Sequence, residues 1–312
     1  MRKFLIQVAL FSIPLVAVTA GILFLKAPEK FQYTYLRDDC DARGWWLYQR
    51  LFTQEKPVDM AFIGTSRTMR GVNDSLLEGY LDSAGNHSKV LNAGYCRFGR
   101  DLEALVAGDI LQTNPGLKKI IIEVNEKEGI SGHPVYYCLA DSRELLVPES
   151  FVNQEYFGNI YKGFSVRLDY LRRNFLQTEK PLRPGIAQFG CVHTDHRADT
   201  ADLLQSKKHC FENPWNKAPG SWKKFQLRYT FAWLNHIVQQ AKEQGCEIAF
   251  LYLPAYGCGN AAPRELEYYK QFGDVFIPPL SILDKPENWS DHDHFNSNGS
   301  RELTRWLYES LR

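Results

Sequence analysis

The sequence has almost no excess charge of either sign, because 37 Lys and Arg residues stand against 36 Asp and Glu residues, a formal net charge of +1. A chain without a broad cationic field lacks the main driving force for binding along a phosphate backbone. Nucleic acid is therefore not expected as a partner. Low-complexity tracts and internal repeats are also missing, and 44% of the residues are hydrophobic. These features predict a globular chain, and its 312 residues suffice for a buried core without metal ions.

Paired CxxC knuckles are missing too, which argues against a structural zinc site. One cluster has metal-capable side chains at Cys191, His193, Asp195 and His196, with His209 and Cys210 nearby, but its spacing matches no zinc motif. We expect no metal there, and a Cys191–Cys210 bond could tie this polar loop.

The cysteine total is seven, so an oxidising compartment allows up to three disulfides and leaves at least one thiol unpaired within the chain. Their connectivity cannot be derived, and Cys246 reads as a buried thiol.

Charge is absent from Phe4 to Leu25, a run of 22 residues with Arg2 and Lys3 before it and Lys26 after it. Such a run can cross a hydrocarbon core as one helix. We expect residues 1–26 to form a cytoplasmic tip and a single-pass membrane anchor, with the remaining chain extracytoplasmic because basic residues favour the cytoplasmic side. Cleavage of a signal peptide near Ala20 and a buried core helix are the alternatives.

Short apolar runs alternate with helical patterns along the rest of the chain. The runs predict about five strands: Val58–Gly64, Lys89–Ala93, Lys118–Val124, Glu247–Leu253 and Asp274–Ile277. Apolar residues at three- and four-residue steps predict helices over Ser75–Leu81, Leu102–Leu111, Trp222–Ala241 and the C-terminal residues 303–311. This alternation predicts an α/β fold, in which helices cover both faces of a mostly parallel sheet.

Two segments interrupt this organisation. Residues 27–57 read as a juxtamembrane segment, and residues 58–312 as one domain with an insertion at about residues 127–220. The insertion is rich in proline and aromatic residues but has little clean periodicity. Insertions on an α/β core usually lie on the ligand-binding face, so a lid is one interpretation and a packed decoration is the other.

Two separated motifs supply the parts of a serine nucleophile. Ser66 follows a predicted strand in Ile63-Gly64-Thr65-Ser66, at the start of a helix whose N–H groups could stabilise an anion. Asp291 and His294 lie three residues apart in a polar loop before the last helix. A histidine can take the serine proton, and a carboxylate can orient that histidine. His292 competes with His294 as the base, but its spacing from Asp291 is less favourable. Alone, each motif could equally be a helix cap or a solvated loop.

In this order and on this α/β background, the two motifs resemble those of the SGNH (GDSL-like) hydrolase superfamily, from about Val58 to Leu311. The resemblance implies a three-layer, flavodoxin-like sandwich with Ser66 as nucleophile, His294 as base and Asp291 as its orienting acid. It also implies oxyanion donors at Gly94 and Asn125. The sequence departs from the family pattern at Gly64-Thr65-Ser66 and at Glu123-Val124-Asn125-Glu126, where Glu123 and Glu126 could be solvated charges and Asn125 a turn residue.

The motif Ile63-Gly64-Thr65-Ser66-Arg67-Thr68, combined with an N-terminal anchor, resembles the membrane-tethered branch of the superfamily, which includes proteins of D-alanyl transfer and of alginate O-acetylation. This resemblance implies an esterase or O-acyltransferase that acts on an acylated cell-surface glycan beside a membrane-bound O-acyltransferase, without a cofactor. Arg67 and Arg70 flank the nucleophile and could bind an anionic group of the substrate, or they could be surface charges. The alternative function is a non-catalytic envelope module that binds a glycan or an acyltransferase partner.

Overall fold

The computed structural model describes residues 1–40, 42–54, 56–126, 131–178, 190–211, 219–258 and 262–312. Its centre is a five-stranded sheet of β1 (Met60–Ile63), β2 (Val90–Asn92), β3 (Lys119–Val124), β4 (Glu247–Tyr252) and β5 (Asp274–Phe276). All neighbouring pairs are parallel. The strand order is β2-β1-β3-β4-β5, which is the flavodoxin-like order of a doubly wound sheet. The α/β prediction with about five strands is therefore confirmed, and each predicted strand lies within three residues of its observed bounds.

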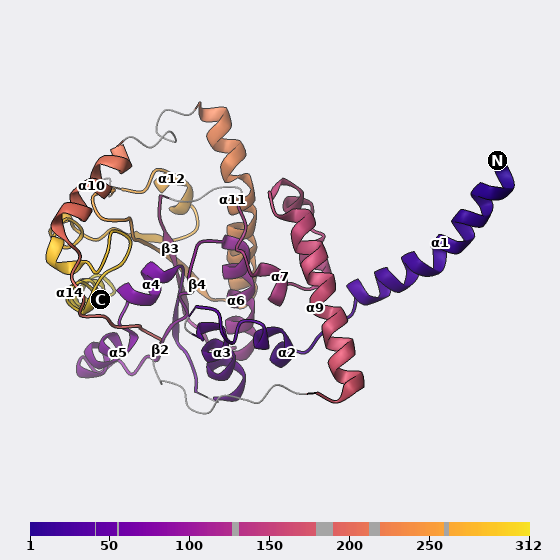
Figure 1. The fold of residues 1–312 in the computed structure, drawn as a ribbon. Helices are drawn as coiled ribbons and strands as arrows, with labels where there is room; N and C mark the ends of the chain where they lie inside the picture. The colour runs from indigo at the N-terminus through magenta and orange to yellow at the C-terminus, as the bar shows by residue number, and fades with distance from the viewer. Residues whose placement is uncertain (41, 55, 127–130, 179–189, 212–218, 259–261) are drawn as a thin grey trace.

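Alternate residues of each strand point to opposite faces of the sheet and enter two separate cores. Ala61, Ile63, Ile120 and Ile122 face the first core, which α6 (Arg100–Thr113) and α11 (Gly220–Glu243) cover. Phe62 and Ile121 face the second core, together with apolar residues of α5 (Asp74–Ser83), α13 (Leu280–Leu283) and α14 (Ser297–Ser310). Figure 1 shows the sheet between these two helical layers. The strands are buried on both faces, which explains why they read as continuous apolar runs.

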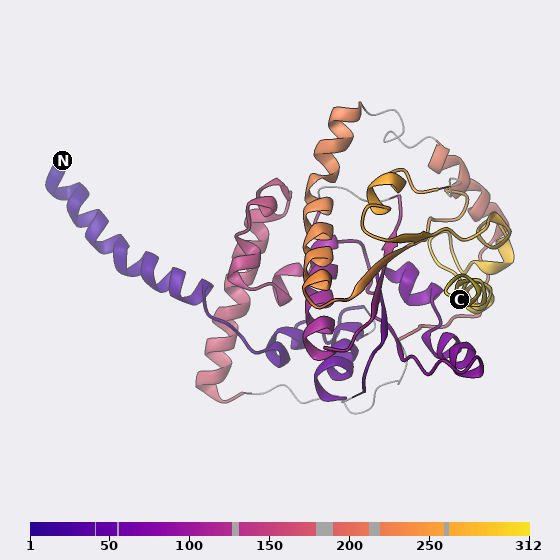
Figure 2. The ribbon, with the colours of Figure 1, turned by 180° about the vertical axis from the view of Figure 1, so that it is seen from behind.

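The N-terminal residues contain a long exposed helix and a compact helical segment. The helix α1 (Arg2–Leu23) projects from the rest of the molecule, as Figures 1 and 2 show, and is long and apolar enough to cross a membrane or to act as a signal sequence. It is followed by α2 (Glu29–Thr34), α3 (Arg43–Tyr48) and the π-helical turn η1 (Gln49–Thr53). Residues of this segment, including Tyr33, Leu36, Leu47 and Leu51, belong to the first core. The predicted juxtamembrane segment thus packs against the sheet domain.

The predicted insertion contains regular structure that its sequence pattern did not indicate. Its described elements are α7 (Tyr136–Leu139), α8 (Ser142–Leu145), the 3-10 turn η2 (Pro148–Val152), α9 (Tyr156–Leu176) and α10 (Thr200–Phe211). The parts at residues 127–130, 179–189 and 212–218 lie outside the described residues. The remaining elements among the described residues are α4 (Ser66–Gly71), α12 (Leu266–Tyr269) and the 3-10 turn η4 (Pro286–Asn288).

Disulfide bonding involves three of the cysteines that the structure describes. Cys40 is bonded to Cys96 with a Cα–Cα distance of 5.7 Å, and Cys258 is also disulfide-bonded. Cys138, Cys191 and Cys246 are free, with Cys138 and Cys246 buried. The suggested bond between Cys191 and Cys210 is therefore wrong. Cys191 lies beside Ser300 of α14 instead, with 3.8 Å between Sγ and Oγ.

Candidate active site

The carboxyl ends of β1 and β3 meet at one edge of the sheet and bring Ser66 to a buried carboxylate. After β1, Gly64 and Thr65 make the turn into α4, and Thr65 caps this helix by accepting a hydrogen bond from the Arg67 N–H at 3.1 Å. A Cβ atom at Gly64 would collide with the side chains of Glu123 and Thr68. The turn therefore requires glycine because the Glu123 carboxylate lies directly against it.

Glu123 holds this turn through its side chain. Its carboxylate, 1% exposed as a residue, accepts hydrogen bonds from the N–H and hydroxyl groups of both Thr65 and Thr68 at 2.7–3.0 Å. Asn125 donates its amide to the same carboxylate at 2.8 Å. A negative charge at the first turn of a helix is favoured by the exposed N–H groups there. Glu123 is thus a fixed cap on the helix that carries Ser66, and the reading of Glu123 as a solvated charge is wrong.

The second part of the site is a closed loop between η4 and α14. Trp289 and Phe295 form an antiparallel bridge, and both side chains are buried in the second core. The Trp289 indole donates to the Leu283 carbonyl, and Asn296 caps α14 by accepting from Asn298 and Gly299. These anchors at both ends of the loop fix its middle residues, Asp291 to His294, above the sheet edge.

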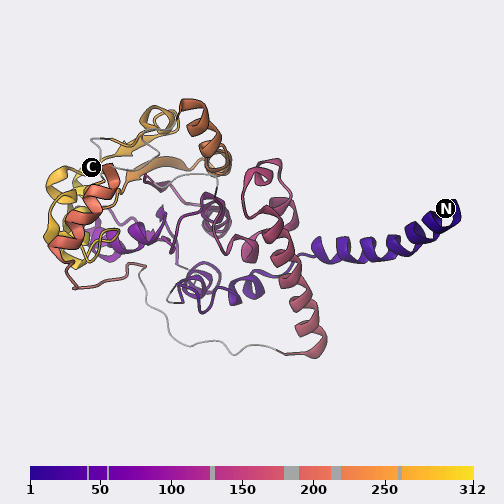
Figure 3. The ribbon, with the colours of Figure 1, turned by 45° about the horizontal axis from the view of Figure 1, so that its top comes forward.

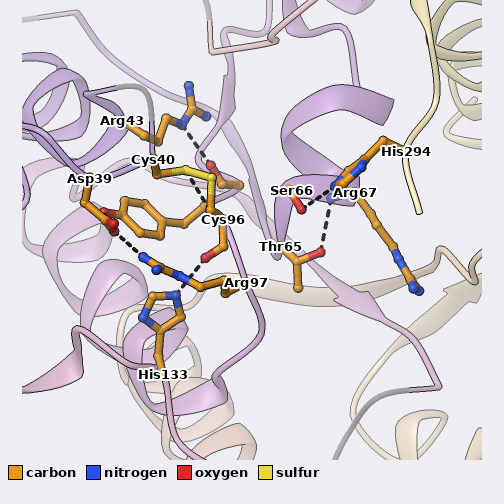
Figure 4. Close-up of a disulfide and its surroundings, with 12 residues drawn as sticks. Asp39, Cys40, Arg43, Thr65, Ser66, Arg67, Cys96, Arg97, His133 and His294 are labelled. Carbon is orange, nitrogen blue, oxygen red and sulfur yellow. Dashed lines mark hydrogen bonds and ion pairs between the residues drawn. A yellow bond between two sulfur atoms is a disulfide. The ribbon is translucent and has the colours of Figure 1, made fainter. Parts of the chain in front are cut away.

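Ser66, His294 and Asp291 lie in one hydrogen-bonded line. Ser66 Oγ is 2.7 Å from His294 Nε2, and His294 Nδ1 is 2.8 Å from Asp291 Oδ1. Figure 4 shows the serine and the imidazole pointing toward each other from α4 and the 289–296 loop. A carboxylate can only accept, so Nδ1 carries the imidazole proton and Nε2 is left as the acceptor for the serine hydroxyl. The geometry suits proton transfer from Ser66 to His294.

The Asp291 carboxylate is held in its ionised form. It also accepts hydrogen bonds from the backbone N–H groups of Asp293 and His294, at 2.8 and 3.0 Å. Its partial burial alone would raise its pKa, but the bonds from His294 and the backbone outweigh burial and lower the pKa of Asp291 below its ordinary value. The carboxylate therefore stays charged over the range in which an imidazole titrates.

His292, the competing base, has no place in this line. Its side chain is 58% exposed and pairs with Asp293, with 3.4 Å between Nε2 and Oδ2.

In the cluster considered as a metal site, Cys191 Sγ lies 3.9 Å from His193 Nδ1, and the side chains of His209 and Cys210 lie outside the described residues.

Arg67 is a buried link between the two parts of the site. Its guanidinium, on a residue that is 4% exposed, pairs with Glu126 at 2.9 Å and with Asp293 at 2.5 Å, and donates to the Leu253 carbonyl at 2.9 Å. Burial alone would lower the pKa of Arg67, but the carboxylates raise it above its ordinary value. The expectation that Arg67 binds an anionic substrate group is wrong because these partners occupy its guanidinium, and Glu126 is likewise not a solvated charge.

Arg70 has a different setting from Arg67. It lies one helical turn after Ser66, so the two side chains share a face of α4. It is only partly exposed, and its buried Nε atom has no hydrogen-bond partner among the described residues.

The predicted oxyanion donors differ in their availability. The Ser66 N–H begins α4 and has no acceptor in the part of the chain that the structure describes. The Gly94 N–H donates to Asn92 Oδ1 at 3.0 Å, so Gly94 is not available as predicted. Gly94 is needed for a close approach instead, because a Cβ there would lie 2.5 Å from the Met69 nitrogen. Asn125 is buried beside Glu123, which fixes one N–H of its amide.

The loop after β2 is clamped against the site by groups that the sequence motifs did not reveal. Arg43 is buried and donates to the carbonyls of Asn92, Gly94 and Gly190 at 2.6–2.8 Å. Burial lowers the pKa of Arg43 to about 10. Figure 4 shows this arginine and the Cys40–Cys96 disulfide on the side of the loop away from His294. An isolated arginine in a helical segment carries no signal for such a role.

His133 packs against the same loop and makes the stability of the protein sensitive to acid. Its Nε2 donates to the Cys96 carbonyl at 2.7 Å, and burial lowers the pKa of His133 to about 4. In the unfolded chain a histidine has a pKa of about 6.5. Between about pH 6.5 and pH 4, His133 therefore binds a proton in the unfolded chain but stays neutral in the folded protein. The free energy of unfolding should thus fall by up to about 3 kcal/mol from this group between pH 7 and pH 4.

Urea unfolding of the wild type and His133→Gln across this range tests the effect, because glutamine keeps a donor for the Cys96 carbonyl but does not titrate. Other groups oppose the trend, since burial raises the pKa of Asp101 to about 6. The comparison therefore uses the difference between the two proteins. Equal pH slopes for both would show that His133 does not contribute.

No protein-family model matches the sequence, and a search of curated proteins returns no match. Among solved structures, the chain is similar to one described as "a putative platelet activating factor from Streptococcus pneumonia", with a TM-score of 0.41 and 11% identity over 89% of this chain and 95% of that chain. Similarity at this level assigns no activity. The structure by itself defines a parallel α/β protein with a serine, a histidine and an aspartate in line at the carboxyl edge of its sheet.

Proposed function

We propose that this protein is an SGNH-type serine esterase or O-acyltransferase. The observation that carries the proposal is the line from Ser66 Oγ through His294 to Asp291, with distances of 2.7 and 2.8 Å. Three residues from two distant segments meet with the donors and acceptors that nucleophilic catalysis requires. A serine that only started a helix would not need a histidine at hydrogen-bond distance.

In the proposed reaction, Ser66 Oγ attacks the carbonyl carbon of an ester while His294 Nε2 takes its proton. Asp291 holds the Nδ1 proton and stabilises the imidazolium that forms. The negative charge on the carbonyl oxygen is stabilised by the Ser66 N–H at the start of α4. The resemblance implies the Asn125 amide as a second donor, which would first have to exchange its bond to Glu123. His294 then protonates the leaving alcohol, and the acyl group stays on Ser66. Water or an acceptor hydroxyl attacks this acyl-enzyme and gives its proton to His294. The bond from the acyl carbon to Ser66 Oγ then breaks, His294 returns the proton to Oγ, and the acid or the new ester is released.

The proposed substrate is an acylated cell-envelope glycan. The support is the apolar helix α1, which we propose anchors the protein as a single-pass membrane protein with its sheet domain outside the cytoplasm. The resemblance to membrane-tethered members of the superfamily supports the same setting and a membrane-bound O-acyltransferase as partner. Arg70, on the same face of α4 as Ser66, is the proposed contact for an anionic group of the substrate.

One observation favours the alternative of a non-catalytic envelope module. The Gly94 N–H already donates to Asn92 Oδ1, so one donor that the resemblance implies for an oxyanion is occupied. A module of this kind would keep the fold and bind a glycan or an acyltransferase without forming an acyl-enzyme.

Covalent labelling separates the two functions. A fluorophosphonate probe should label the wild-type chain on Ser66, because the probe reacts with a serine whose proton a neighbouring base removes. Labelling should be lost in Ser66→Ala and retained in His292→Ala, which changes only the exposed neighbouring histidine. Mass spectrometry of the labelled peptide identifies the site. A folded wild-type protein that takes up no probe would support the binding module.

A further inference from the structure

The helix α9 has two apolar faces, and the fold covers only one of them. The inner face packs on the domain through buried residues, which include Tyr156, Gly163 and Val166. The outer face carries side chains at alternating four- and three-residue steps, the spacing of one helical stripe. Its members are Phe157, Tyr161, Phe164, Leu168, Leu171 and Phe175. All are exposed except the half-buried Phe164, and Phe157 and Phe175 are more than 80% exposed. We call this set the outer stripe.

The outer stripe lies where the apolar helix α1 leaves the domain. The end of α1 contacts the α8–α9 region, because Ser142 Oγ donates to the Leu23 carbonyl and Arg167 Nε donates to the Leu25 carbonyl at 3.1 Å. In Figures 1, 2 and 3, α9 is the outermost helix of the domain on the side toward α1, and it runs crosswise to α1. Figure 3, in which the top of the molecule is tilted forward, shows this arrangement most plainly.

These positions determine what would face the outer stripe if α1 enters a bilayer. A membrane surface lies across the axis of a helix that spans it, so a helix crosswise to α1 at its point of exit lies along that surface. An α9 of 21 residues would extend about 30 Å over it, at 1.5 Å per residue. Helices in the membrane interface have one face of aromatic and leucine residues and polar or basic residues beside it. Arg172, four residues after Leu168, is exposed beside the outer stripe and pairs with Asp169 at 2.6 Å.

We propose that the outer stripe of α9 rests in the headgroup region of the membrane that α1 enters. This inference rests on the proposed membrane anchoring. The occupant is a lipid surface because the covalent attachment of α1 brings a bilayer to this side of the domain. With α1 and α9 both attached, the sheet domain has a fixed orientation above the membrane instead of rotating about one flexible link.

The test uses the full-length chain in lipid nanodiscs that contain a phospholipid with a diazirine near its headgroup. After illumination, mass spectrometry maps the cross-linked residues. We expect cross-links on α1 and on the outer stripe, and none on α5 (Asp74–Ser83), which lies on the far side of the domain in Figure 1. The triple variant Phe157→Glu, Leu168→Glu and Phe175→Glu should lose labelling of α9 at least tenfold while α1 keeps its labelling.

A matched triple variant with Phe157→Leu, Leu168→Phe and Phe175→Leu keeps the apolar stripe and should label like the wild type. Melting temperatures control for folding. Labelling of α9 at the level of α5, with α1 labelled, would overturn the lipid contact and leave the anchor standing. If a separate bifunctional amine cross-linker joined two chains through α9, and lipid adducts were missing there, the result would overturn the lipid contact in favour of a second copy. Absence of label from α1 would instead refute the proposed anchor.

Discussion

Replacing Ser66 by alanine should abolish hydrolysis of an activated acetyl ester, and replacing His294 by alanine should cost nearly as much. Without the imidazole 2.7 Å away, the serine stays a neutral hydroxyl and a poor nucleophile. Each change should lower kcat by at least about 10³-fold, and the double variant should be no worse than either alone because the residues act as a unit. Steady-state kinetics of the two single variants and the double variant measure this.

Asp291→Asn should lower kcat by about 10²- to 10⁴-fold, less than the loss of the serine. The asparagine amide would present a donor to His294 Nδ1, which favours the tautomer with its proton on Nε2 and removes the acceptor for Ser66. His292→Ala is the matched control and should keep wild-type kcat, because its exposed ring does not contact Ser66 in the structure. Full activity of Ser66→Ala at an unchanged melting temperature would reduce Ser66 to the first residue of a helix.

Replacing Arg67 by methionine should cause the largest loss of stability among single changes near the site. The change keeps much of the side-chain length but removes the positive charge from Glu126 and Asp293, whose side chains are 10% and 20% exposed. Removing one partner of a buried ion pair leaves an uncompensated charge and costs about 3 to 5 kcal/mol. Urea unfolding should show the corresponding decrease in the free energy of unfolding.

Arg70→Met on the same short helix is the matched control for Arg67→Met. Arg70 has no ion pair with the described residues, so its replacement should change the free energy of unfolding by less than about 1 kcal/mol. Arg67→Met should also lower kcat, because Asp293 directly precedes His294 in the loop that Arg67 holds. Equal unfolding midpoints for the Arg67 variant and the wild type would show that the carboxylates need no counterion.

Periodicity and residue type were sufficient to predict the strands, the helices that cover them and the hydrophobic N-terminal helix. Each strand is a short run of apolar residues between helical patterns. Because such a strand is buried on both faces, nearly all its residues are apolar, and the local sequence is enough to predict it. Ser66, Asp291 and His294 were selected because their two motifs, in this order on an α/β background, resemble those of the SGNH superfamily; taken alone, each motif could have been a helix cap or a solvated loop. The helix α9 was not predicted, because apolar residues on both its inner and its outer face obscure the pattern of a single amphipathic face.

What only the tertiary structure decided is which polar groups are already bound. Gly94 N–H is engaged by Asn92, and the Arg67 guanidinium by Glu126 and Asp293, so neither serves the role that its sequence position suggested. Glu123 lies 58 positions from Thr65 in sequence, yet its carboxylate accepts the hydrogen bonds that fix the turn before Ser66. Hydrogen bonds and ion pairs between distant segments depend on side-chain directions and burial, which the order of residues does not specify. The sequence therefore determines which groups can react, and the packing of the chain determines which of them remain available to do so.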